Sequence, residues 1–232
     1  MNIIPNRDLL LAFINQYKLN SLFETDISDH MSLFLFQKGA LVCECSSKLE
    51  YLYFLVSGKL KIYTLLANGK SLLLRFNKPL SVIGDVEFLN KSKVICNVEA
   101  QVDSYLIGIK FTDLNLFAYN DPTFLRFIIT SLSHKLYTAS NTASLNLLYP
   151  LETRFACYLL AISVKQENES RVAEIKAEKL TEVAMLLGTS YRHLNRIINI
   201  FRQENILSKE KKALKVLDFN KLKSLAKDNI YE

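Results

Sequence analysis

Residues 180–203 contain two short segments with apolar residues at helical spacing, separated by one glycine. This stretch constrains the fold more than any other part of the sequence. Apolar residues recur at helical spacing on both sides of Gly188: Leu180, Val183, Ala184 and Leu187, then Leu194, Ile197, Ile198 and Phe201. Glycine adopts positive φ without a Cβ clash, so Gly188 predicts a sharp turn, and Ser190 is a favourable N-cap for the second helix. The stretch is therefore predicted to be two helices joined by a tight turn.

The other face of the second predicted helix is polar and basic, as a helix in a DNA groove requires. Its outward residues are Tyr191, Arg192, Asn195, Arg196, Asn199 and Arg202. No Asp or Glu occurs from Val183 to Gln203, whereas three arginines do, and such a face suits contacts to phosphates and guanines. The alternative is a pair of amphipathic helices in an ordinary helical domain.

The charge distribution agrees with a nucleic-acid partner for the C-terminal part. Residues 1–150 have 14 Lys and Arg against 12 Asp and Glu, whereas residues 151–232 have 15 against 11. The basic excess is therefore concentrated with the helical pair, although a solvated basic surface would give the same balance. With 50% hydrophobic and 22% charged residues, the chain is expected to fold around a sizeable core.

Several classes of function have no sequence feature to support them. The N-terminus lacks a signal-peptide pattern, and no apolar run reaches the roughly 18 residues of a membrane span, so we expect a soluble cytoplasmic protein without a membrane partner. No Walker loop, paired carboxylates or nucleophile with its base is present, and the three histidines are scattered. The chain is not expected to be an enzyme.

The N-terminal half has the pattern of a small antiparallel β-structure. Residues 2–17 are expected to be helical, followed by short helical or irregular structure over residues 19–29. From Met31 to Ile109, short runs of β-branched and aromatic residues alternate with turn signals, and strands are expected to include the run VIGDVEF. Asn68-Gly69 predicts a two-residue hairpin turn. The set indicates a barrel or jelly roll, which can enclose a small ligand.

A long helix is predicted after this region, with Asp121 as its N-cap and Pro122 at its first position. Its apolar residues alternate spacings of four and three: Leu125, Ile129, Leu132, Leu136, Ala139 and Ala143. This seam is typical of a coiled coil and predicts a dimerisation helix. The alternative is a helix packed along its own domain. Pro150 is the expected hinge between domains.

The C-terminal region after the hinge is predicted to be a winged helix-turn-helix. Residues 151–165 are expected to be helical, Gln166–Ser170 to be a polar loop, and residues 206–217 to form a β-hairpin wing with Lys211 and Lys212 at its basic tip. We predict an α+β chain in three parts: an antiparallel β-roll (1–119), a dimerisation helix (120–149) and the winged helix-turn-helix (150–232).

This order of elements resembles the Crp/Fnr family of bacterial transcription regulators over essentially the whole chain. The resemblance is carried by LEYLYFLVSGKLKIY with its central Gly58, by IGDVEFL at 83–89 and by LTEVAMLLGTSYRHLNRIINIFRQENIL. The run SYRHL also resembles the YeiL-like branch of the family. The resemblance implies a homodimeric, sequence-specific regulator that reads a near-palindromic operator in double-stranded DNA, works with RNA polymerase and responds to a signal at the β-roll.

The resemblance also implies which residues enter the major groove: Ser190, Tyr191, Arg192, His193, Asn195 and Arg196. In the family, the usual reading residues are an arginine, a glutamate and a second arginine one turn later. Tyr191 and Arg192 stand at the first two positions here, and only Arg196 is retained. The helix is expected to dock as in the family but to read a different operator, with Arg196 on a guanine.

The effector site implied by the resemblance is only partly present. Gly84 and Asp85 match the start of the family's cyclic-nucleotide motif, but the stretch that should clamp the phosphate begins with Lys93 and contains no arginine. A buried phosphate without a guanidinium would be poorly compensated, which argues against a cyclic nucleotide. The expectation is another small-molecule effector, or a pocket filled by the chain's own side chains.

The cysteines leave a redox alternative open. Cys43 and Cys45 are two residues apart and would share one strand face, and Cys96 could approach them in a rolled sheet, so the three could bind metal or an iron–sulfur cluster. Against this, buried cysteines often serve as small apolar residues, and no cofactor is predicted. Two further alternatives are a C-terminal domain that binds protein and a regulatory subunit of a kinase-like enzyme.

Overall fold

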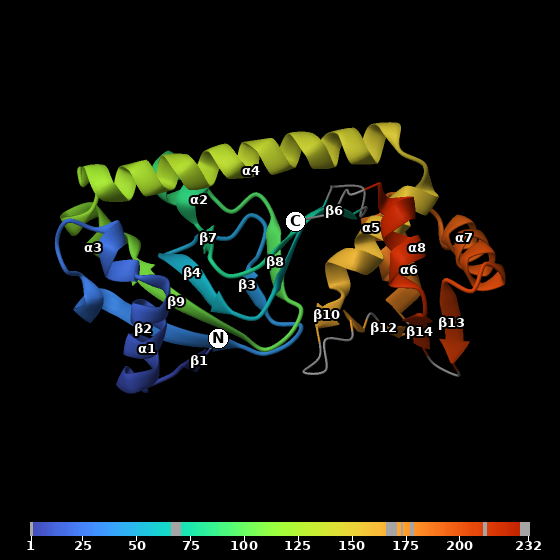
Figure 1. The fold of residues 1–232 in the computed structure, drawn as a ribbon. Helices are drawn as coiled ribbons and strands as arrows, with labels where there is room; N and C mark the ends of the chain where they lie inside the picture. The colour runs from blue at the N-terminus through green and yellow to red at the C-terminus, as the bar shows by residue number, and fades with distance from the viewer. Residues whose placement is uncertain are drawn as a thin grey trace. The chain divides into compact units, whose positions relative to one another are not determined.

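A computed structural model describes residues 2–65, 71–165, 171–172, 174–176, 179–210 and 213–227 (Figure 1). The chain divides into two compact units, the first comprising residues 1–64 and 76–138 and the second residues 65–75 and 139–232. The predicted Asn68-Gly69 turn and the predicted loop at 166–170 lie outside the described residues.

The N-terminus begins with a strand, and the prediction of a helix from residue 2 was wrong there. Strand β1 (Asn2–Ile3) pairs antiparallel with β2 (Met31–Phe36). Helix α1 (Arg7–Tyr17) starts only after Asn6, whose side chain accepts a hydrogen bond from the Leu9 amide at 2.9 Å. Two short 3₁₀ helices, η1 (Leu19–Leu22) and η2 (Ser28–His30), follow as expected.

Two antiparallel sheets form the predicted β-roll. One has the strand order β1-β2-β9-β4-β7 and the other β3-β8-β5-β6. The strands not yet given are β3 (Leu41–Cys43), β4 (Tyr51–Ser57), β5 (Leu60–Leu65), β6 (Ser71–Asn77), β7 (Ser81–Ile83), β8 (Asn97–Ala100) and β9 (Ser104–Lys110). Five consecutive residues of β4 are buried, so both faces of this strand are covered.

Two short helices accompany the β-roll, and one of them lies where a strand was expected. Residues 85–90, expected to continue a strand, form helix α2 (Asp85–Asn90), because Gly84 has a φ of +94° and turns the chain out of β7. Helix α3 (Phe111–Phe117) follows strand β9 directly.

Helix α4 (Pro122–Leu148) begins as predicted. One carboxylate oxygen of Asp121 accepts hydrogen bonds from the amides of Thr123 at 2.8 Å and Phe124 at 3.1 Å. These bonds satisfy two of the amide groups that lack intrahelical partners in the first turn. Its 27 residues span about 40 Å at the α-helical rise.

The second unit contains helices α5 (Leu151–Ile162), α6 (Leu180–Leu186), α7 (Tyr191–Gln203) and α8 (Phe219–Ala226). The predicted wing consists of β13 (Leu207–Glu210) and β14 (Ala213–Val216), and β12 (Glu174–Lys176) pairs with β14 as an unpredicted third strand. A further pair, β10 (Val164–Lys165) with β11 (Arg171–Val172), corrects the prediction of a helix over residues 151–165, because α5 ends at Ile162.

The turn between β4 and β5 generates a stability prediction. Gly58 has a φ of +99°, and a Cβ there would lie 2.7 Å from the Cα of Ser104. Gly58→Ala is expected to lower the free energy of unfolding by about 3 kcal/mol, because backbone strain and a backbone clash add together. Gly39→Ala is the control, since Gly39 has a φ of +85° but nothing within 4 Å of a Cβ, and it should cost about 1–2 kcal/mol. Equal losses in urea unfolding would contradict the clash.

Candidate nucleic-acid interface

The turn between α6 and α7 is closed by two nested backbone hydrogen bonds. The amide of Gly188 donates to the carbonyl of Met185 at 2.9 Å, and the amide of Thr189 donates to that of Ala184 at 2.9 Å. With a φ of +62° at Gly188, this is the Schellman arrangement that ends a helix sharply. The Oγ of Ser190 then accepts from the amide of His193 at 3.2 Å, which confirms the predicted N-cap of α7.

A contact that the sequence did not indicate supports the end of α6. The Nη1 of Arg154, on α5, donates to the carbonyl of Leu187 at 2.6 Å. This carbonyl belongs to the last turn of α6, where intrahelical donors are lacking. Arg154 therefore fixes the position of the turn relative to α5, although in the sequence it has the pattern of an ordinary surface arginine.

Helix α7 buries one face and exposes the other. The predicted apolar row is buried: Leu194, Ile197, Ile198 and Phe201. Within this unit the ring of Phe201 stacks on that of Phe155 at a centroid distance of 5.8 Å. Of the residues predicted to enter the major groove, Asn195 is half-buried, and the others are exposed: Ser190, Tyr191, Arg192, His193 and Arg196. Arg202, predicted to face outward, is exposed as well.

The exposed face of α7 carries its own hydrogen bonds. His193 Nε2 lies 3.2 Å from Arg196 Nη2, and His193 Nδ1 lies 3.4 Å from Thr189 Oγ1. Farther along, Arg202 Nη1 donates to the Asn199 Oδ1 at 3.4 Å. Arg196 and Arg202 thus contact side chains that carry no negative charge, which leaves the face positively charged.

The wing is basic in part. Lys215 on β14 pairs with Glu210 on β13 at 2.8 Å, which neutralises one of its charges. The predicted tip residues Lys211 and Lys212 lie outside the described residues.

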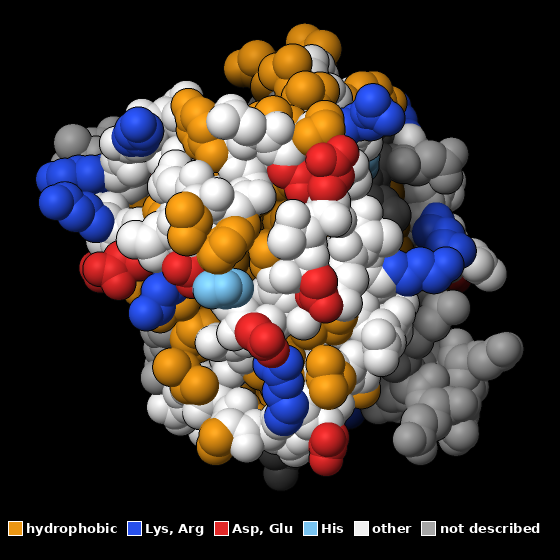
Figure 2. Space-filling view, turned by 90° about the vertical axis from the view of Figure 1, so that its left-hand side faces the viewer, with side chains coloured by type: hydrophobic (Ala, Val, Ile, Leu, Met, Phe, Trp, Pro, Cys, Tyr) orange, Lys and Arg blue, Asp and Glu red, His pale blue; other side chains and the backbone are white. Residues whose placement is uncertain are grey.

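The predicted seam of α4 lies mostly on the exposed side of the helix. Ile129, Leu136, Ala139 and Ala143 are exposed, whereas Leu125 and Leu132 are half-buried and Leu132 packs against the β-roll core. Apolar side chains project at the top of the face in Figure 2, at the level of α4 in Figure 1. The inward side of the same helix carries Phe124, Ile128 and Thr138, which are buried.

The predicted effector corner is already occupied by a side chain of the protein. Asp85 is only 1% exposed, and Lys135 from α4 donates to its two carboxylate oxygens at 2.5 and 2.6 Å. The same ammonium donates to the carbonyl of Val82 at 2.9 Å, so three acceptors surround one cation. The sequence prediction named Gly84 and Asp85 but missed Lys135, which lies 50 residues away from Asp85.

Lys93 does not join this corner. It is exposed and lines a separate cavity of about 260 Å³, whose lining includes Lys48, Lys91 and Glu87 but neither Gly84 nor Asp85. Burial raises the pKa of Glu87, and the nearby Asp85 carboxylate raises it further. The three residues predicted to form one effector site are therefore divided between two places.

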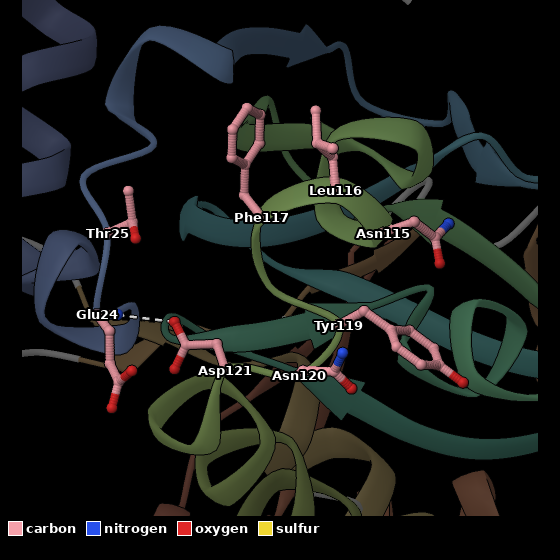
Figure 3. A pocket seen from close by; sticks show the side chains of 8 residues that line it. All are labelled: Glu24, Thr25, Asn115, Leu116, Phe117, Tyr119, Asn120 and Asp121. Atoms are coloured by element: carbon pink, nitrogen blue, oxygen red, sulfur yellow. Dashed lines mark hydrogen bonds between the residues drawn. The ribbon is translucent and has the colours of Figure 1, made fainter.

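A second cavity, of about 240 Å³, lies between the loop at Glu24 and the end of α3 (Figure 3). Asp121 points toward Glu24 and accepts a hydrogen bond from its amide at 2.7 Å, whereas Leu116 and Phe117 point away from this bond. Because Asp121 is committed to that amide and to the cap of α4, its part in the cavity is structural.

The cysteines do not form the arrangement that the redox alternative needs. Strand β3 ends at Cys43, so Cys45 lies beyond it and the expectation of a shared strand face was wrong. Cys43 is buried, and burial raises the pKa of its thiol to about 12, whereas the Cys45 Sγ lies 3.6 Å from the carbonyl of Ile95. Within the described part of the chain, no three His, Cys, Asp or Glu side chains are grouped to hold a metal.

Among the described residues, no helix has the length and apolar composition needed to cross a bilayer.

Comparison with known proteins finds a matching domain family for each half of the chain. A cyclic nucleotide-binding domain family matches residues 33–120, and a Crp-like helix-turn-helix domain family matches residues 153–225. The chain is also similar to the regulatory protein YeiL of Escherichia coli O157:H7, with 29% identity over 204 residues that cover 88% of this chain and 90% of that protein.

Solved structures share the fold. A CRP-family transcriptional regulator from Thermus thermophilus superposes with a TM-score of 0.68 at 18% identity, covering 86% of this chain and 98% of that one. FixK2 from Bradyrhizobium japonicum gives a TM-score of 0.62 at 20% identity, covering 84% and 96%. At these identities the likeness concerns the fold alone.

The pair of Asp85 and Lys135 generates a stability prediction. Lys135→Met is expected to lower the free energy of unfolding by about 3–5 kcal/mol, because it leaves a buried carboxylate without its cation. Adding Asp85→Asn should recover most of that loss, since the remaining group is neutral. Lys91→Met, at an exposed position, is the control and should change stability by less than about 0.5 kcal/mol. A Lys135→Met protein as stable as the control in urea unfolding would contradict the buried pair.

Proposed function

This chain belongs to the Crp/Fnr family of transcription regulators, and we propose that it acts as a homodimer that binds a near-palindromic DNA sequence. The proposal includes the α7 residues as the reading surface, the apolar seam of α4 as the dimer contact, and the β-roll as the part that receives a regulatory signal. RNA polymerase is the expected protein partner of the DNA-bound dimer.

The observation that carries the proposal is the exposed, acid-free face of α7. Its arginines project from a helix whose other side is buried, and the turn before this helix is held by nested backbone hydrogen bonds and by Arg154. A helix presented in this way can enter a major groove and place donors against phosphates and guanine edges. A protein-binding face would have no need to exclude every carboxylate over this stretch.

The dimer proposal is supported by exposure along α4. Leu136 is 74% exposed and Ile129 64% exposed, and both belong to the spacing typical of a coiled-coil seam. Burying such residues against a second copy removes apolar surface from water. Two copies related by a two-fold axis would present their α7 helices to successive major grooves, about 34 Å apart.

The effector proposed for the β-roll is not a cyclic nucleotide. The carboxylate of Asp85, which would face a ligand, is instead neutralised by Lys135. A ligand that needs this carboxylate would have to displace a cation held by three acceptors, and the stretch after Lys93 offers no arginine for a phosphate. We infer that the regulator binds DNA without a cyclic nucleotide and that its signal acts elsewhere on the β-roll.

In vitro selection from a random duplex pool, without added effector, tests the proposal. Recovery of an inverted repeat with half-sites about one helical turn apart is the expected result. Binding should weaken steeply as salt rises, because phosphate contacts release counterions. Failure to enrich any sequence, or binding that salt leaves unchanged, would favour a C-terminal domain that binds protein.

Arg196→Ala is expected to weaken binding to the selected operator by about 1–3 kcal/mol, because the guanidinium supplies a guanine contact. The loss should be confined to operators that keep the wild-type base at one position of each half-site. Arg126→Ala removes an exposed arginine of α4 and should leave affinity unchanged. Fluorescence anisotropy at fixed salt measures both, and equal affinities for the two variants would exclude Arg196 as a reading residue.

Leu136→Glu is expected to convert the dimer into a monomer, because it places a charge in the apolar seam. Leu116→Glu is a matched control, since Leu116 on α3 is also 74% exposed but lies off the seam. Sedimentation equilibrium should give the mass of one chain for the first variant and of two chains for the second. A Leu136→Glu protein that remains dimeric would move the interface away from α4.

A further inference from the structure

The arginine proposed to read DNA has an acceptor of its own on α7. Arg196 Nη2 lies 3.2 Å from His193 Nε2, one turn earlier on the helix. A guanidinium has only donors, so Nε2 accepts and the imidazole proton resides on Nδ1. Nδ1 is 3.4 Å from the Thr189 Oγ1, which is placed to accept that proton's hydrogen bond. The order Arg196 to His193 to Thr189 therefore has a single consistent direction of donation.

The sequence around Arg196 leaves few other acceptors. Its helical neighbours three and four positions away are Arg192, His193, Asn199 and Ile200. Of these, Asn199 accepts from Arg202 at 3.4 Å, whereas the side chain that Arg196 contacts is His193. His193 is thus the acceptor that α7 itself provides for Arg196.

The chemistry of this acceptor suits a DNA-reading face. A carboxylate in the same place would orient the guanidinium more strongly but would repel the phosphates of the duplex. A neutral imidazole orients the guanidinium without adding negative charge. Because a free arginine side chain loses rotamer freedom when it docks, partial ordering beforehand reduces that cost.

We propose that His193 is a positioning residue that presents Arg196 to one base pair of each half-site, with Thr189 holding the imidazole in the required tautomer. The proposal rests on the proposed DNA-binding function. It assigns to His193 a part in sequence discrimination that differs from a direct contact to a base or a phosphate.

Two substitutions distinguish the positioning of Arg196 from a direct contact of His193 with DNA. His193→Gln keeps a side-chain carbonyl that can accept from Arg196, whereas His193→Leu has similar bulk and no acceptor. Neither removes the N-cap bond of α7, because that bond uses the backbone amide of residue 193. Circular dichroism and thermal unfolding should therefore be close to wild type for both.

The test measures affinity for the selected operator and for operators changed at single base pairs. His193→Leu is expected to lose discrimination about five- to tenfold at the same base pair as Arg196→Ala, a part of what a full guanine contact provides. Its affinity should fall with salt as steeply as that of wild type, because no phosphate contact is lost. His193→Gln should keep the wild-type discrimination.

Three results would overturn the proposal. The first is a His193→Leu protein that discriminates as wild type does. The second is a loss of affinity by this variant that is equal for every operator and has a shallower salt dependence, which is the behaviour of a phosphate contact. The third is an imidazole proton found on Nε2 by nitrogen-15 NMR of the free protein.

Failure of the proposed function would look different from these results. In that case the wild-type chain enriches no DNA at all, and no variant can be compared with it. A wild-type protein that binds its operator while the Leu variant is unaffected overturns only the part assigned to His193.

Discussion

The turn at Gly188 determines which side of α7 is exposed, and the DNA-reading proposal depends on it. The two nested backbone hydrogen bonds end α6, and the Ser190 cap starts α7 directly afterwards. With this geometry the apolar row of α7 reaches the ring of Phe155 while the arginines face solvent. A longer or differently bent turn would rotate the helix and bury a different set of side chains.

Local chemistry was readable from the sequence, whereas pairing between distant residues was not. Ser190 and Asp121 each satisfy amides two or three residues ahead, so a pattern of a few residues was enough to predict where α7 and α4 begin. Arg154 and Leu187 are 33 residues apart, and no periodicity reveals their contact. Strand β12 was missed because three residues are too few to show alternation. Residues 85–90 were misjudged because Asp85 to Phe88 alternate polar and apolar residues as a strand does, and six residues are too few to show the helical period.

Helix α4 illustrates how two apolar stripes can share one helix. The predicted seam and the inward row that contains Phe124 and Ile128 are offset by about one residue, which corresponds to roughly 100° around the helix. Sequence spacing identified only the seam, because Lys135 and Thr138 interrupt the inward row with polar side chains. The lysine stands there because its ammonium meets the carboxylate of Asp85, so a charged residue in an otherwise buried row marks a specific partner.

The third strand of the wing has a consequence for how this region can be altered. β12 comes before α6 and β14 comes after α7, yet the two strands pair through Glu174, Ile175 and Lys176. The sheet therefore ties together the entry and the exit of the helical pair, and residues 174–216 form a module whose ends meet. This module also depends on α5, which contributes Arg154 to its turn and Phe155 to the buried side of α7. A transplant meant to carry the proposed operator choice to a related regulator therefore has to include α5 together with residues 174–216.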